Sequence, residues 1–246
     1  MKVFTILLFL YFPLSVSSQT SDSSKSIYAG SVSLSGFYQS GNTNKFYVSS
    51  TGDVKRSSET LETILAATFG YGENRMRKDD NVLSSVLTID LFYKNRISPF
   101  LLQIYEYNFA KGIDVRSQSG GGVKYVLIPE AKHKSSVSLA LIYDYTNLAN
   151  HPGNYDVDVM RLSWRLKTRQ EIFDSHLIFS GIGFFQPALN DFSKRNIRIE
   201  TSLSIPITKI IFANINYLYS FDDIVSLNRK RADNKLTFGF RVGFGE

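Results

Sequence analysis

The sequence predicts an all-β fold, a single antiparallel up-and-down transmembrane β-barrel of about 12 strands. Two observations lead to this prediction. From Tyr28 onward, apolar and polar residues alternate with a period of two, in segments of about ten residues separated by turn signals, as expected for half-buried strands. The connections also alternate between long polar loops and tight turns, which is typical of barrels in the outer membrane of bacteria.

The N-terminus indicates export of the chain. Lys2 precedes an apolar run, and small residues follow it ahead of Gln19, which is the pattern of a cleaved secretory signal peptide. We therefore expect three parts: a signal peptide at residues 1–18, a short polar segment at 19–27 and a barrel domain at 28–246. The chain contains no cysteine, so we expect neither a lipid anchor nor disulfides.

The first two strands form a hairpin around the sequence Ser-Gly-Asn-Thr-Asn, at residues 32–38 and 46–55. One face carries Val32, Leu34, Tyr38, Phe46 and Val48, and the other carries Ser31, Ser33, Ser35, Ser49, Thr51, Asp53 and Lys55. In a membrane barrel, apolar side chains face lipid and polar ones face the lumen, so serine at every second position indicates a hydrated interior. A soluble β-sandwich also alternates, but we expect more Lys, Glu and Thr on its outer face.

The remaining strands follow in order. They are predicted at residues 61–72, 83–94, 99–109, 116–128, 135–146, 158–170, 175–186, 196–205, 210–221 and 235–244. The pattern is clearest in 158–170, where Met160, Leu162, Trp164 and Leu166 alternate with basic and hydroxyl residues. It is most ambiguous in 99–109, whose phase the sequence leaves open. Long loops are predicted around residues 73–81, 147–157 and 222–233. The three consecutive glycines at 120–122 lie within a strand and indicate curvature.

Several motifs resemble a known family. They are Ser40-Gly41-Asn42-Thr43 in the first turn, and Gly112-Ile113-Asp114 followed by Arg116. With these motifs, residues 28–244 resemble an uncharacterised bacterial family known as salt-induced outer-membrane β-barrel proteins, which contain a domain of unknown function. The resemblance implies an outer-membrane barrel and, through the family's name, a response to salt stress. It implies no substrate.

Polar residues on the predicted inner face form the candidate functional site. They are Arg161, Arg165, Lys167, Arg198, Arg241 and Lys124, together with the acids Asp90, Asp144 and Glu200. Rings of Arg and Lys select anions in pores, which favours a narrow, anion-preferring channel. The same charges could instead pair across the lumen and plug it, and a 12-strand barrel lies between the filled and the open sizes.

Catalysis and cofactors are not expected. An outer-membrane lipid hydrolase needs a serine with a histidine base, and the three histidines, His133, His151 and His176, are predicted in or next to turns and loops. The Gly-x-Ser-x-Gly motif is absent, and neither clustered histidines nor an Asp-rich loop of calcium spacing indicates a metal site. We therefore expect no enzyme and no cofactor.

Charge and export together suggest the partners. The formal net charge is +6, with Lys and Arg scattered singly, which favours anionic lipid headgroups over nucleic acid. We expect a monomer in the outer membrane of a Gram-negative bacterium, with lipopolysaccharide and the barrel-assembly machinery as partners. The predicted function is a narrow channel or an envelope-integrity protein. The alternative is a plugged scaffold whose outer loops bind a ligand or partner, and a lipid-modifying hydrolase is less favoured.

Overall fold

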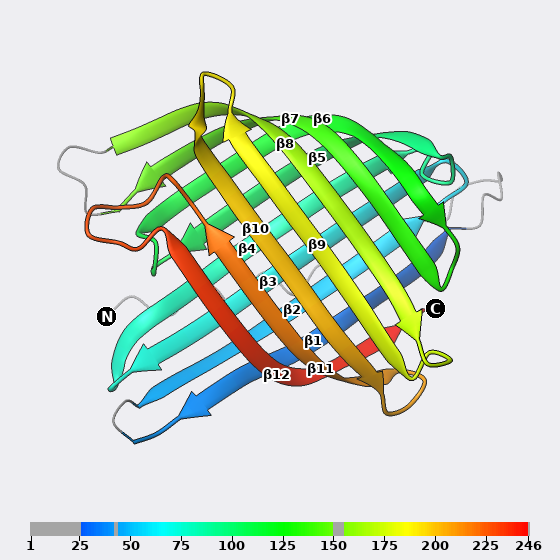
Figure 1. Cartoon of the computed structure of the whole chain (residues 1–246), viewed down its shortest axis with the longest axis horizontal. Coiled ribbons are helices and arrows are strands. Elements are labelled where there is room, and N and C mark those ends of the chain that lie inside the picture. The colour runs from blue at the N-terminus through cyan, green and yellow to red at the C-terminus, as the bar shows by residue number, and fades with distance from the viewer. Residues whose placement is uncertain (1–25, 42–43, 150–154, 246) are drawn as a thin grey trace, which may run out of the picture.

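The computed structural model describes residues 26–41, 44–149 and 155–245, which form a closed barrel of 12 antiparallel strands (Figure 1). The strands are β1 (Ile27–Gln39), β2 (Lys45–Ser57), β3 (Leu61–Asn74), β4 (Arg77–Leu91), β5 (Ile97–Asn108), β6 (Ile113–Pro129), β7 (His133–Leu148), β8 (Tyr155–Ile172), β9 (Leu177–Ala188), β10 (Asp191–Pro206), β11 (Ile211–Phe221) and β12 (Ala232–Phe244). The predicted fold class is confirmed. The expected signal peptide lies outside the described residues, and within them no helix is long and apolar enough to cross a membrane.

The barrel closes by direct pairing of its first and last strands. Each strand pairs with the next one in sequence, and β1 then pairs with β12 in a register that places Gly30 opposite Phe244 and Gly36 opposite Phe238. Closure leaves no unpaired strand edge, which a sheet surrounded by lipid cannot tolerate. Because the strand number is even, β1 begins and β12 ends at the same end of the barrel, which we call the terminal end. The opposite end is the loop end.

The connections differ from the expected pattern at the loop end. The polar stretch 73–81 is not a long loop, because β3 and β4 extend through most of it and meet at Arg75 and Met76, both with positive φ angles of 50° and 62°. Likewise, β9 and β10 are separated only by Leu189 and Asn190. Strands that continue past the membrane surface meet water on both faces, so their alternation disappears and the sequence pattern resembles a loop.

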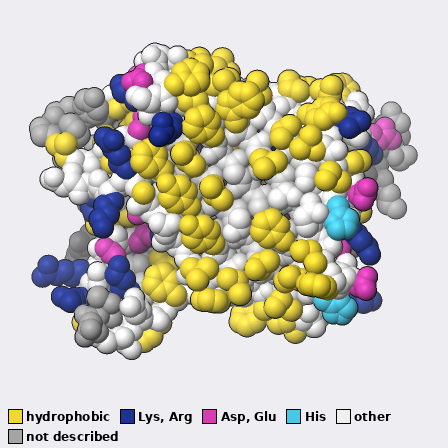
Figure 2. Space-filling model, viewed as in Figure 1, with side chains coloured by type: hydrophobic (Ala, Val, Ile, Leu, Met, Phe, Trp, Pro, Cys, Tyr) yellow, Lys and Arg dark blue, Asp and Glu magenta, His cyan; other side chains and the backbone are white. Residues whose placement is uncertain are grey.

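The apolar faces of the strands point outward. On β12, Leu236, Phe238 and Phe240 are 50–60% exposed, and Trp164 on β8 is 51% exposed. Hydrophobic side chains cover much of the middle of the face seen in Figure 2, whereas Lys and Arg side chains gather toward the loop end at the left. This arrangement is that of a protein whose outer surface contacts lipid, and it excludes the β-sandwich, which would bury these side chains.

Part of the interior is packed. Phe100 and Leu102 from β5 meet Ala140 and Ile142 from β7 in a buried apolar cluster, with Val86 and Ile104 beside it. The strand between them, β6, contributes glycines at these positions, since Phe100 pairs with Gly122 and Leu102 with Gly120. A Cβ atom on Gly120 would lie 2.2 Å from the carbonyl oxygen of Leu141. The glycines therefore permit close packing of the wall, and the phase of β5 places Phe100, Leu102 and Ile104 inside.

Candidate functional site in the barrel interior

Hydroxyl groups line the inner face of the first strands. The hydroxyl of Ser31 donates to a carboxylate oxygen of Asp53 at 2.5 Å, and Ser35 and Ser49 share a hydrogen bond of 3.0 Å between β1 and β2. These residues are paired directly across the two strands. The alternation of serine with apolar residues thus has a structural cause, because each second side chain faces the polar interior.

An interior cavity of about 610 Å³ lies within the barrel. Its charged lining is predominantly basic. The cations are Lys55, Lys111, Arg116, Lys124, Lys134, Arg165, Lys167, Arg169 and Arg198, and the acids are Glu62, Asp90, Glu106, Glu200 and Asp222. Of the predicted lumen residues, six line this cavity: Lys124, Arg165, Lys167, Arg198, Asp90 and Glu200. The cavity has nine cations against five acids, so its electrostatic potential favours anions.

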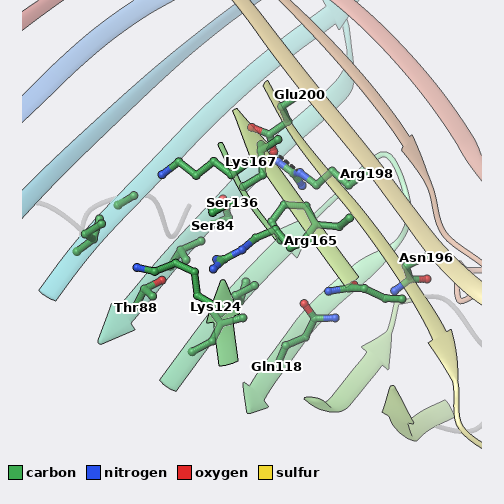
Figure 3. A pocket seen from close by; sticks show the side chains of 18 of the residues that line it. Ser84, Thr88, Gln118, Lys124, Ser136, Arg165, Lys167, Asn196, Arg198 and Glu200 are labelled. Atoms are coloured by element: carbon green, nitrogen blue, oxygen red, sulfur yellow. Dashed lines mark hydrogen bonds and ion pairs between the residues drawn. The ribbon is translucent and has the colours of Figure 1, made fainter. Parts of the chain in front are cut away.

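Two cations of β8 reach into the cavity (Figure 3). The guanidinium of Arg165 donates to the Ser138 hydroxyl at 3.0 Å and lies 4.8 Å from the ring centre of Phe100. Lys167 is exposed within the cavity. Among the described residues, no carboxylate lies within ion-pair distance of either side chain, although more distant acids contribute to their electrostatic surroundings. Their positive charges are therefore available to an anion.

Two other cations of the lining are paired. The ammonium of Lys124 on β6 lies 2.5 Å from Asp90 on β4. Arg198 pairs with Glu200 two residues further along β10. These pairs lower the net charge of the cavity locally, so they contribute less to its preference for anions than Arg165 and Lys167 do.

A buried ion network lies toward the loop end. Arg116 on β6 is within 3.0 Å of Asp222, 3.5 Å of Glu106 and 3.6 Å of Asp144. The network continues through Asp144, which accepts a hydrogen bond of 2.8 Å from Nε of Arg161 on β8. Buried charges are stable only when they are paired and hydrogen-bonded, and this network satisfies that condition.

Arg161 belongs to this network and does not line the cavity. Its side chain is fully buried, and it donates to Asp144, to Asp223 at 3.1 Å and to the backbone oxygen of Gln186 at 3.1 Å. Arg241 also lies away from the cavity lining, with its guanidinium 4.4 Å from the ring centre of Phe212. The structure therefore divides the predicted basic face into a paired part, which holds the wall together, and an available part.

The loop at residues 222–231 folds inward over the network. Asp222 forms ion pairs with Arg116 and Lys111, and Asp223 pairs with Arg161. Further along, the hydroxyl of Ser226 donates to the carbonyl oxygen of Gly112 at 2.9 Å. Figure 1 shows this segment, in orange-red, at the loop end between β11 and β12. The loop thus contacts the opposite wall of the barrel, at β6 and β8, instead of extending into solvent.

Apolar packing and electrostatics both fix this loop. Ile224 is buried against Ile113 and Leu148. Burial alone would raise the pKa of Asp222, but the charges of Arg116 and Lys111 and their hydrogen bonds lower it to about 2. Asp222 is therefore ionised at neutral pH, and the ion pairs that hold the loop persist.

The family motif lies at the contact with this loop. Gly112 has a φ of +65°, and a Cβ on it would lie 2.5 Å from the Ser226 side chain. Ile113 packs against the loop, Arg116 binds its first residue, and Asp114 is exposed. Ser40 and Gly41 follow β1 at the loop end, while Asn42 and Thr43 lie outside the described residues.

Sequence reasoning missed the partners of this motif. Lys111 is not among the predicted site residues, and Asp222, Asp223, Ile224 and Ser226 are predicted only as part of the outer loop 222–233. The adjacent acids at 222 and 223 were a visible signal, since two carboxylates directly after a strand could meet basic residues of the inner wall. Lys111 and Asp222 are 111 residues apart in the sequence, so no local sequence pattern indicates that they form an ion pair.

His133 and His176 lie apart from the cavity. His133, at the start of β7, contacts the side chain of Gln170, and His176 lies in the turn before β9, where its ring contacts the carbonyl oxygen of Phe173. His151 lies outside the described residues. Within the described part of the chain, no group of three or more His, Asp and Glu side chains is placed to hold a metal ion.

Comparison with known proteins places the fold. A family model described as "Protein of unknown function, DUF481" matches residues 32–244. No curated protein matches the sequence. Among solved structures, the NanC porin is similar with a TM-score of 0.51 and 10% identity, covering 87% of this chain and 97% of that one. The translocator domain of the autotransporter NalP from Neisseria meningitidis has a TM-score of 0.47 and 12% identity, covering 89% and 87%. The KdgM porin is similar with a TM-score of 0.45 and 9% identity, covering 89% of this chain and 99% of that one.

Proposed function

Because the chain belongs to the DUF481 family of proteins of unknown function, we propose its function from the chemistry of its own interior: a narrow channel that prefers anions. The observation that carries this proposal is the pair Arg165 and Lys167, whose charges face the cavity without a carboxylate at ion-pair distance within the described residues. Fixed cations along a narrow passage raise the local concentration of anions and repel cations. The fold is that of an outer-membrane barrel, and porins are among the structures that share it.

Ion selectivity in planar lipid bilayers tests this function. Under a KCl gradient, the reversal potential of the wild-type protein should indicate chloride preference. The double variant Arg165→Ser/Lys167→Ser should lower the ratio of chloride to potassium permeability at least two-fold. The matched control is Lys94→Ser/Lys209→Ser, which removes the same charge from exposed turns at the terminal end and should leave the ratio unchanged. Equal ratios in the wild type and the cavity variant would refute the role of these cations.

A closed scaffold is the second candidate function. The observation that favours it is the inward fold of residues 222–231, which are fixed by the ion pairs of Asp222 and Asp223. In this case the barrel anchors outer segments that bind a ligand or a partner. The predicted binding loop at 222–233 would then act through its docked conformation. Of the other predicted loop, at 147–156, residues 150–154 lie outside the described residues. Correctly folded barrels that remain electrically silent would favour this candidate.

We also propose the location and the partners. Residues 1–18 would direct export of the chain and then be cleaved off. The barrel-assembly machinery would insert the mature chain, which would remain a monomer among lipopolysaccharide and other outer-membrane lipids, with the loop end outside the cell. A role in envelope integrity under salt stress follows only from the name of the resembling family. The lack of enzymatic activity stays a prediction, which a lipid hydrolase activity abolished by His176→Ala would contradict.

A further inference from the structure

The interior cavity has an apolar wall that a passage for small ions does not need. Beside its charged groups, it is lined by Ile64, Ala66, Val86, Leu102, Ile104 and Val126 from β3 to β6. The lumen of a water-filled pore is polar, because exposing apolar side chains to water costs about 25 cal/mol per Å². This cavity instead combines apolar side chains with basic ones, as ligand-binding sites do.

Three basic side chains lie close to this apolar wall and line the same cavity. Arg165 and Lys167 project from β8, and Lys124 projects from β6 into the same cavity (Figure 3). The guanidinium of Arg165 is held in place by Ser138 and by the ring of Phe100. A charge that is fixed in this way, and has no carboxylate partner at ion-pair distance within the described chain, is prepared to bind an anionic group.

Size and closure suit a small organic molecule. The cavity volume of about 610 Å³ lies within the range of roughly 300 to 1,000 Å³ that is usual for ligand sites. Toward the loop end, Arg116 and Asp222 are joined in the buried ion network. A molecule in the cavity would therefore be shielded from the outer solvent by residues 222–231.

We propose that this cavity binds amphipathic organic anions, whose carboxylate, sulfonate or phosphate group contacts Arg165 and Lys167 while the apolar body lies against β3, β4 and β5. An inorganic anion would leave the apolar wall in contact with water, and a neutral apolar molecule would leave the cations without a partner. An organic cation would be repelled. The proposal deepens the channel function and rests on it for the route of the ligand, but the binding itself does not require conduction.

Equilibrium binding tests the proposal independently of current. The full chain is folded into lipid nanodiscs and titrated calorimetrically with naphthalene-2-sulfonate, after subtraction of the signal from empty nanodiscs. The comparison probes are methanesulfonate, which lacks the apolar body, and 2-naphthylmethanol, which lacks the charge. We expect naphthalene-2-sulfonate to bind at least ten-fold more tightly than either.

Two variants locate the site. Arg165→Gln/Lys167→Gln should weaken the binding of naphthalene-2-sulfonate at least ten-fold. Val86→Thr keeps the side-chain shape but replaces a methyl group of the apolar wall by a hydroxyl, and it should weaken binding at least three-fold. Lys94→Gln/Lys209→Gln, which removes the same charge outside the cavity, should bind as the wild type does. Resistance of the folded barrel to SDS at room temperature checks that each variant has folded.

The possible outcomes separate the binding site from the channel. Equal affinity for naphthalene-2-sulfonate and methanesulfonate, or unchanged affinity in the folded Arg165/Lys167 variant, would overturn the proposed site. Anion-selective current without binding of the aromatic probe would overturn the site and leave the channel standing. Binding that depends on Arg165 and Lys167 but is accompanied by no current would support the site and contradict the channel.

Discussion

At the scale of single residues, Asp144 is the centre of the buried network. It accepts a hydrogen bond of 2.8 Å from Arg161 and lies 3.6 Å from Nε of Arg116, and all three side chains are buried. Inside a protein, the cost of removing a charge from water is offset only while its partner remains. One carboxylate on β7 therefore helps to compensate guanidinium groups on both neighbouring strands, β6 and β8.

We predict that Asp144→Asn lowers the free energy of unfolding by about 3 to 5 kcal/mol, the range for breaking a buried pair on one side. The measurement is urea unfolding of the barrel in lipid vesicles. Asp158→Asn serves as the control, because Asp158 is exposed and accepts a hydrogen bond from the Tyr143 hydroxyl outside the network. An equal decrease in the free energy of unfolding in the two variants would contradict a stabilising role of the buried network.

The titration of Asp222 predicts how the docked loop responds to pH. Its pKa of about 2 lies below the ordinary value of about 3.9, so its ionisation stabilises the docked state above about pH 4. This contribution is lost as the pH falls through about 2. Hydrogen exchange, corrected for its intrinsic rate, should show residues 222–231 protected at pH 5 and unprotected near pH 2. In Asp222→Asn, protection should already be weak at pH 5; wild-type protection in this variant would contradict the prediction.

The alternation of single residues could be predicted, but their partners could not. The period of two assigns Arg161 and Arg165 to the same inner face, and the structure places both there. Yet Arg161 forms ion pairs with Asp144 and Asp223, whereas Arg165 faces the cavity. The difference depends on contacts with residues 17 and 62 positions away from Arg161, and a local sequence pattern contains no information on such pairing.

At the scale of elements, the segment 222–231 covers the opening of the barrel at the loop end, which we call the mouth. It contacts β6 through Arg116 and β8 through Arg161, and its own Ile224 is buried against Ile113 and Leu148. We predict that replacing residues 224–229 by two glycines increases single-channel conductance at least two-fold in planar bilayers, because the mouth is then no longer covered. The anion preference should persist, since Arg165 and Lys167 remain. Unchanged conductance would mean that the restriction lies elsewhere in the lumen.

Strand positions were predictable, whereas strand ends at the loop side were not. All 12 predicted segments coincide with observed strands, but β6 begins three residues before the predicted 116–128 and β10 begins five residues before 196–205. The apolar alternation marks only the part of a strand that touches lipid. Beyond it, the hydrogen-bonded ladder continues between polar residues, as in the turn at Arg75 and Met76, and sequence periodicity no longer reports it.

At the scale of the whole molecule, the outward apolar surface and the closed sheet depend on each other. The exposed side chains Leu139, Leu141 and Tyr143 on β7 are each 42–47% exposed, a state that is stable only when lipid surrounds them. The strand ladder in turn can sit in lipid only because β1 pairs with β12, so that the backbone N–H and C=O groups of these two strands are also hydrogen-bonded. This mutual dependence explains why composition and period alone predicted the fold class, although neither predicted that the interior would contain an apolar wall.

The same dependence predicts opposite outcomes for one substitution on the two faces of the sheet. Leu141 lies outward near the middle of β7, so Leu141→Arg should lower the free energy of unfolding in vesicles by about 2 to 4 kcal/mol, the cost of arginine near the bilayer midplane. Ser202 on β10 pairs with Asn216 on the inner face, so Ser202→Arg should cost much less and should instead increase anion preference. If both arginines cost the same, the outward face is not the lipid face, because only a hydrated lumen accepts a new charge without this penalty.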